Sequence, residues 1–290
     1  MKLELQRNII IPSLVTIGNG ICGFSALWLL CKVDAQPGTL TIDTPPPAAF
    51  AQAGWLILLG MVFDVFDGKV ARMSGGSSAL GAQLDSLCDL ITFGLVPSVL
   101  TLSLGQLSHS PVWWQRATWF FSLAYFLGAM LRLARFTAEN EPDEEAHLAF
   151  KGLPTPGAAG CMASLVIFYS YIAEFQKKEL QLLERFIDPE TLKRGVGCIP
   201  WILPPLALVL GYTMVSNRLV FEHVGSRLFS RKHSFDFFVY LIFAVIVAAV
   251  VPEILLPLLF FGYLLHAPIR LITQHLAQRR AAEAADEIQG

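Results

Sequence analysis

The chain has 290 residues, of which 54% are hydrophobic and only 15% are charged. Because an average soluble domain carries about 25% charged residues, this composition predicts a protein that crosses a membrane several times. The formal net charge of −2 argues against nucleic acid as a partner. The five cysteines are scattered without a CxxC pair, which argues against a disulfide framework and against a zinc site.

Apolar runs long enough to form membrane-spanning helices recur along the chain. A helix needs about 20 mostly apolar residues to cross a bilayer. Eight segments are expected to do so, namely 10–30, 48–72, 81–105, 114–137, 155–174, 199–216, 235–250 and 253–272. The expected fold is therefore all-α, a polytopic integral membrane protein with about eight transmembrane helices. The first run lacks a signal-peptide cleavage pattern and is expected to be a retained span.

Lysine and arginine are unequally divided between the two expected sides of the membrane. The side that holds both termini collects fourteen of them, and the opposite side collects seven. Since cytoplasmic loops carry the excess of these residues, both termini and the loop after the second span are expected to face the cytoplasm. The segment 176–194 is the exception, because it carries five of the seven opposing charges.

Four aspartates lie where the second and third spans meet. Asp64 and Asp67 are three residues apart and share one helix face, while Asp85 and Asp89 are four apart and share a face of the next helix. The segment RMSGGSSAL between them can turn the chain back. Two antiparallel helices would then present four carboxylates to one another.

These carboxylates need a positive partner. A single aspartate at the bilayer centre costs about 2.5–3.5 kcal/mol, and four together also repel one another. A divalent cation neutralises them, and ligation by oxygen alone suits Mg²⁺ or Mn²⁺. Since Mg²⁺ often binds through a few carboxylates and substrate phosphates, the pattern predicts a substrate that carries phosphate or pyrophosphate. The alternative is a solvated acidic loop at the membrane edge.

Two glycines lie about one helical turn from the acids. Gly68 and Gly81 continue the same helix faces as the aspartates. A missing side chain there would let a ligand approach the backbone. Close packing between helices is the alternative explanation.

The stretch DVFDGKVARMSGGSSALGAQLDSLCD resembles the signature of the CDP-alcohol phosphotransferases. All eight fixed positions of that signature are filled, by Asp64, Asp67, Gly68, Ala71, Arg72, Gly81, Asp85 and Asp89. The stretches IPSLVTIGNGICGFSAL, LRLARF, FKGLPTPGAAG and MVSNRLVF are similar to the phosphatidylserine synthase branch of this family. The resemblance extends from about Ile11 to Phe221. It implies a single membrane domain over 1–275 with a catalytic core at about 8–220. The composition of the last residues predicts a polar tail over 276–290.

The resemblance implies a reaction and roles for the four acids. In this branch CDP-diacylglycerol donates its phosphatidyl group to L-serine, which gives phosphatidylserine and CMP. Asp64, Asp67 and Asp85 would hold a pair of Mg²⁺ or Mn²⁺ ions. Asp89 would be the general base and would also contact the second ion. The acyl chains of the donor would stay among the membrane lipids, and relatives are commonly homodimers.

The resemblance also implies a donor pocket. Asp64, Gly68, Ala71 and Gly81 would border the nucleotide, and Arg72 would meet phosphate oxygens. On the first span, Thr16 and Asn19 would line the nucleotide or acceptor pocket. The alternative for these two polar residues is a buried hydrogen bond between helices.

Two arginines are candidates for binding the acceptor. Arg132 and Arg135 lie three residues apart near the expected cytoplasmic end of the fourth span. They are expected to bind the serine carboxylate or a donor phosphate, and the alternative is anchoring at the membrane surface. Arg218 and Lys232, after the sixth span, are weaker candidates for phosphate or lipid headgroups.

Three other functions stay open. The first is the same chemistry with choline, inositol or glycerol phosphate as the acceptor. The second is a membrane prenyltransferase, which also uses aspartate pairs and Mg²⁺ but lacks the Asp-Gly-x-x-Ala-Arg element. The third is an ion carrier, which would leave Gly68, Arg72 and Gly81 unexplained.

Overall fold

The computed structural model describes residues 2–33, 48–73, 79–106, 110–139, 149–175, 195, 197–216, 220–222 and 251–289. Nearly all of these residues are helical. The helices are α1 (Lys2–Lys32), α2 (Ala48–Met73), α3 (Ala79–Asp89), the π-helix η1 (Leu90–Leu95), α4 (Val96–Gly105), α5 (Val112–Glu139), α6 (Thr155–Phe175), α8 (Ile199–Val215) and α11 (Pro252–Gln289). The two strands are β1 (Ala149–Lys151) and β2 (Val220–Glu222).

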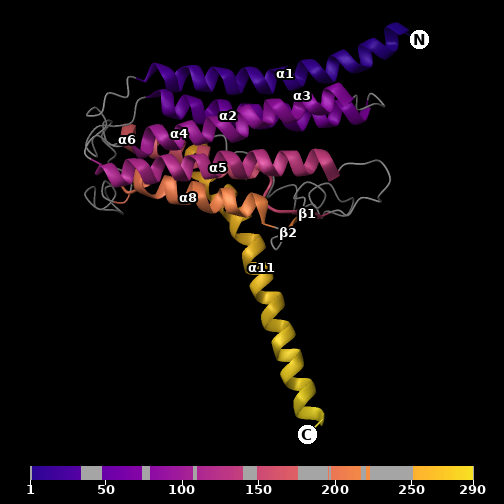
Figure 1. Cartoon of the computed structure of the whole chain (residues 1–290), viewed down its shortest axis with the longest axis vertical. Coiled ribbons are helices and arrows are strands. Elements are labelled where there is room, and N and C mark those ends of the chain that lie inside the picture. Colours follow the sequence, from indigo (N-terminus) through magenta and orange to yellow (C-terminus); the bar gives the residue numbers. More distant parts are fainter. Residues whose placement is uncertain are drawn as a thin grey trace.

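The helices from α1 to α8 lie side by side in a bundle (Figure 1). Helix α1 packs along α2, α2 packs against α6, and α5 packs along α8. The helices α3, η1 and α4 follow one another without a break and together form one span. The end of α2 and the beginning of α3 lie at the same end of the bundle (Figure 1).

Within the part of the chain that the structure describes, six helices are long and apolar enough to cross a membrane. Their spans are Ser13–Lys32, Ala48–Val70, Leu80–Gly105, Val112–Ala138, Thr155–Ala173 and Pro252–Arg270. The predicted fold class, an all-α integral membrane protein, is therefore confirmed. The count of eight is not confirmed, because α8 is shorter, with 17 residues, and the predicted span 235–250 lies outside the described residues.

The bundle has an apolar interior and an apolar exterior. Phe50, Ile57 and Leu203 are fully buried between helices, whereas Phe24 of α1 is 70% exposed and Trp119 of α5 is 56% exposed. Large apolar side chains on the outer surface are expected where lipid replaces water. Helices in such an environment pack through small residues. A Cβ atom on Gly128 of α5 would lie only 2.6 Å from the carbonyl oxygen of Gly211 on α8.

A short strand pair closes the end of the bundle where α6 begins and α8 ends. β1 and β2 are antiparallel, with Phe150 opposite Phe221. Gly152 follows β1 with a φ of 86°, a conformation that glycine adopts without steric cost. The Leu153 N–H then donates to the carbonyl oxygen of Thr213 at 3.1 Å. The sequence pattern had not indicated these strands.

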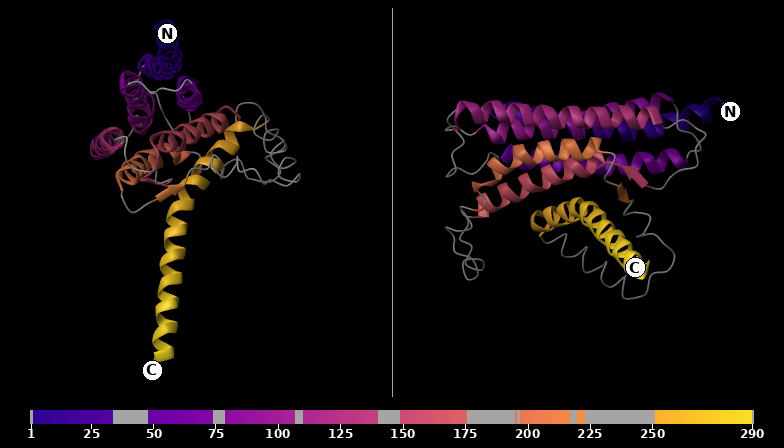
Figure 2. Two further views of the ribbon diagram at one scale, coloured as in Figure 1. Left: turned by 90° about the vertical axis from the view of Figure 1, so that its right-hand side faces the viewer. Right: turned by 60° about the horizontal axis from the view of Figure 1, so that its bottom comes forward.

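The last helix includes the expected polar tail. Helix α11 continues to Gln289, so the stretch predicted as a polar tail, 276–290, is helical up to that residue. Its first half packs against α6, where the ring of Phe260 meets Gly160 and the ring of Tyr263 meets Gly157. Its second half runs away from the bundle (Figures 1 and 2).

Candidate active site

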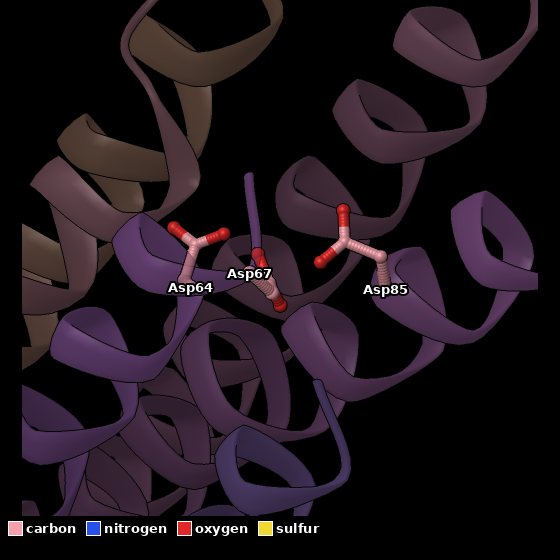
Figure 3. A group of neighbouring side chains, drawn as sticks. All are labelled: Asp64, Asp67 and Asp85. Atoms are coloured by element: carbon pink, nitrogen blue, oxygen red, sulfur yellow. The ribbon is translucent and has the colours of Figure 1, made fainter. Parts of the chain in front are cut away.

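Three of the four aspartates converge at one end of the bundle. Asp64 and Asp67 project from α2, and Asp85 faces them from α3 (Figure 3). One carboxylate oxygen from each residue lies within 4.8 Å of the others. The facing arrangement that the residue spacing predicted for the two helices is present for these three side chains.

The cluster formed by Asp64, Asp67 and Asp85 has the properties of a cation site. Asp67 is only 6% exposed, and it accepts hydrogen bonds from the Thr16 side chain and the Gly68 backbone. Asp67 Oδ2 and Asp85 Oδ1 are buried without a hydrogen-bond partner. Buried acceptors of this kind are costly unless something pairs with them. Carboxylate oxygens are ligands that Mg²⁺ and Mn²⁺ accept, so the residues present fit a divalent cation.

Asp89 lies beside this cluster but outside the group of three. It is 7% exposed and lies close enough to Asp64 and Asp85 to be repelled by both. The Asn19 side chain of α1 donates from Nδ2 to Asp89 Oδ1 at 2.8 Å. Asp89, which the resemblance implies is both a metal ligand and the general base, therefore has a hydrogen-bond partner of its own and is not one of the three clustered carboxylates.

Helix α1 supplies a polar partner to each of two acids. Thr16 reaches Asp67, and Asn19 reaches Asp89. Thr16 is 4% exposed and Asn19 is fully buried. The sequence left open whether these residues line a pocket or bond between helices. The interhelical hydrogen bonds exist, and their partners are the acids of the candidate site.

The glycines of the signature and those of α1 have different surroundings. A Cβ atom on Gly18 would lie 3.0 Å from the Phe63 ring, and one on Gly20 would lie 2.9 Å from Cys88 Sγ. These two glycines therefore serve close helix packing.

A Cβ atom on Gly68 would meet no described atom within 4 Å. This open space favours ligand approach over helix packing at Gly68. Gly81 is half-buried in the first turns of α3, and the side chains of Ala71 and Arg72 lie outside the described part.

Arg132 is a buried cation near the acids. It is 9% exposed, it interacts electrostatically with Asp89, and its Nη1 donates to Thr155 Oγ1 at 3.3 Å. Its Nε is buried without a partner. Arg135, one turn further along α5, is half-buried. The guanidinium of Arg132 thus has a donor available for an acidic group. The weaker candidates, Arg218 and Lys232, lie outside the described residues.

Sequence reasoning missed three residues around this site. Thr155 receives the hydrogen bond of Arg132, Tyr263 of α11 interacts electrostatically with Arg132, and Thr92 bonds to the backbone of Asn19. Thr92 lies three residues after Asp89 in an apolar run, and this spacing was an available signal. Tyr263 offered none, because only the packing of α11 against α6 brings it close.

Comparison with known proteins gives one family. A family model described as CDP-alcohol phosphatidyltransferase matches residues 9–212. Among curated relatives, a CDP-diacylglycerol–serine O-phosphatidyltransferase of Saccharomyces cerevisiae is 33% identical over 57% of this chain. Proteins of the same name from Bacillus subtilis and Mycobacterium bovis are 33% and 32% identical over 56% and 54% of this chain.

The matched regions cover different shares of these relatives. They span 59% of the yeast protein, 78% of the Bacillus protein and 49% of the Mycobacterium protein. The chain therefore covers less than two thirds of two of these three relatives.

The carboxylate cluster generates a prediction about stability. Replacing Asp85→Asn removes one charge from the cluster and offers an amide donor to its neighbours, so the Tm in EDTA should rise. The increase in Tm on adding Mn²⁺ should shrink, since a ligand that binds the folded state stabilises it according to its affinity. We expect roughly tenfold weaker Mn²⁺ binding or more, equivalent to about 1.4 kcal/mol. Thermal unfolding of the detergent-purified protein measures both effects.

Glu253→Gln is the matched control, because Glu253 lies in the first turn of α11 and is not part of the cluster. This control should leave the effect of Mn²⁺ unchanged. If Asp85→Asn lowers the Tm in EDTA and keeps the full response to Mn²⁺, the three carboxylates do not form a cation site.

Proposed function

The chain belongs to the CDP-alcohol phosphatidyltransferase family, and on that basis we propose that it transfers the phosphatidyl group of CDP-diacylglycerol to L-serine and releases CMP. The names of the curated relatives support serine as the acceptor. The observation that carries the proposal is the convergence of Asp64, Asp67 and Asp85, with two buried oxygens that lack partners. The family match argues against the prenyltransferase and the ion carrier.

The cluster is proposed to hold two divalent cations, Mg²⁺ or Mn²⁺. The family uses divalent metals, and Asp64, Asp67 and Asp85 offer the oxygen ligands that such ions require. When bound, the ions supply positive charge against the pyrophosphate of the donor. The protein's own contribution is to hold the three carboxylates together before substrate arrives.

Asp89 is proposed to act as the general base. Its carboxylate would take the proton of the serine hydroxyl as the serine oxygen forms a bond to the phosphorus atom next to diacylglycerol. The bond from that phosphorus to the oxygen of CMP breaks at the same time, and CMP leaves with the bonding electrons. The hydrogen bond from Asn19 to Asp89 supports this role, because a base must be held in a fixed orientation.

The nucleotide and the serine are proposed to bind to different residues around the acids. The open space at Gly68 supports its role at the cytidine, together with Ala71, Gly81 and the phosphate-binding Arg72. Arg132, with its unpaired Nε, supports binding of the serine carboxylate, and Arg135 would assist.

The place of the acyl chains, the orientation in the membrane and the assembly are also part of the proposal. The acyl chains of the donor would lie among the lipids at the apolar surface of the bundle. By the distribution of lysine and arginine, the active site and both termini would face the cytoplasm. A homodimer is the proposed assembly by analogy with relatives.

An acceptor screen tests the proposed function. The purified protein with Mn²⁺ and CDP-diacylglycerol should release CMP when serine is added and should form phosphatidylserine. Choline, inositol and glycerol 3-phosphate should give only background, since the proposed pocket is built for an amino acid carboxylate. CMP release with one of these acceptors and none with serine would assign the protein to another branch of the family. No release with any acceptor would overturn the proposed function.

Replacement of the base gives a second prediction. Asp89→Asn should lower kcat by roughly 10²–10⁴-fold, the contribution expected of a general base, and should leave the fold intact because asparagine has the same shape. Ser86→Ala is the control, since the Ser86 hydroxyl lies on the same helix but bonds to the Ala82 carbonyl and the Thr137 hydroxyl, not to an acid of the site. Near-normal turnover of Asp89→Asn in the CMP assay would remove Asp89 from the chemistry.

A further inference from the structure

The helix that carries Asp89 changes its winding immediately after that residue. Residues Leu90–Leu95 form a π-helix, whose hydrogen bonds join residues five apart, and the Val96 N–H accordingly donates to the Ile91 carbonyl. Such segments are rare and are often found at functional sites. A π turn takes more residues than an α turn, so it shifts the face on which the following residues lie. Thr92 is inside this segment and is fully buried.

The Thr92 hydroxyl differs from the buried hydroxyls that follow it on the same span. Ser98 donates to the Gly94 carbonyl and Thr101 donates to the Pro97 carbonyl, each at 2.7 Å and four residues back. This is the usual local bond of a buried helical hydroxyl. Thr92 instead donates to the backbone carbonyl of Asn19 on α1, at 3.0 Å. Its hydroxyl therefore joins two helices.

Asn19 connects this bond to Asp89. The carbonyl of Asn19 accepts from Thr92, and its side chain donates from Nδ2 to Asp89 Oδ1 at 2.8 Å. An ionised carboxylate only accepts hydrogen bonds, so the amide nitrogen has to face Asp89. The Asn19 Oδ1 atom is left buried without a partner. The contact with Asp89 therefore fixes the orientation of the Asn19 amide, and this orientation leaves the amide oxygen without a hydrogen bond.

Close packing holds Thr92 and Asn19 against each other. A Cβ atom on Gly60 of α2 would lie 2.7 Å from Thr92 Cγ2 and 2.9 Å from Asn19 Oδ1. A Cβ atom on Gly23 of α1 would also overlap the Thr92 side chain. Two glycines therefore let α1 and α2 close around this pair. There is little room for either side chain to change rotamer.

We propose that Thr92 is a positioning residue for Asp89, acting through Asn19. By fixing the backbone of α1 at Asn19, Thr92 keeps the amide on Asp89 Oδ1, and the second carboxylate oxygen is left to accept the serine proton. The π-helix is the feature that directs Thr92 toward α1. This inference rests on the proposed function, in which Asp89 is the base.

Kinetics of three variants test the inference. Thr92→Val keeps the shape of the side chain and removes the donor, so kcat should fall roughly tenfold, as expected for one lost hydrogen bond. The KM values for serine and CDP-diacylglycerol should stay within about twofold, because neither substrate contacts Thr92. Thr92→Ser keeps the hydroxyl and should restore most of kcat. Thr101→Val, a buried threonine with only a local bond, should leave kcat unchanged while matching Thr92→Val in Tm.

Several results would overturn the inference. If Thr92→Val and Thr101→Val lower kcat equally, or if Thr92→Ser is as impaired as Thr92→Val, the role is structural. If Thr92→Val does not fold, Thr92→Cys, with its weak donor, replaces it in the same comparison. A wild-type protein that releases no CMP overturns the proposed function and this inference with it. An active wild type with an unimpaired Thr92→Val overturns the inference alone.

Discussion

Repulsion among carboxylates buried at the end of a membrane bundle is the constraint around which this structure is organised. One carboxylate oxygen from each of Asp64, Asp67 and Asp85 lies within 4.8 Å of the others. Asp89 lies near enough to be repelled by the same charges. Such a group is stable only if hydrogen bonds or cations offset the repulsion. The protein offers hydrogen bonds to Asp67 and Asp89 and leaves oxygens of Asp67 and Asp85 unpaired. The carboxylate oxygens that lack hydrogen-bond partners are the ones available to a cation, and they point to a metal-assisted reaction.

Helix α1 contributes the supporting contacts, and its glycines explain how it comes close enough. Thr16 and Asn19 bond to the acids, while Gly18 and Gly20 let the helix backbone approach Phe63 and Cys88. The side chains of Thr16 and Asn19 are short, so they reach the acids only because the backbone of α1 lies this close. In a membrane, small residues of this kind are the usual means of bringing helices together. Packing and chemistry are therefore joined on one helix, which carries both the glycines and the polar partners.

The sequence predicted the fold class and the pairing of acids because both depend on short-range periodicity. Apolar runs of about 20 residues specify spanning helices, and spacings of three and four residues place Asp64 with Asp67 and Asp85 with Asp89 on shared faces. Contacts between distant segments could not be predicted in the same way. Tyr263 reaches the surroundings of Arg132 only because α11 packs on α6. The π-helix after Asp89 depends on α1 and α5, whose Asn19 carbonyl and Tyr125 hydroxyl bond to it.

The position of bound manganese tests the central claim most directly. Crystals of the protein grown with Mn²⁺ and CDP-diacylglycerol would give an anomalous signal at each manganese ion. The account predicts peaks at bonding distance, roughly 2.0–2.6 Å for hard divalent cations, from the carboxylates of Asp64, Asp67 and Asp85, with the donor pyrophosphate on the other side. Manganese bound elsewhere, with these three carboxylates lacking any ion while the donor is present, would contradict it.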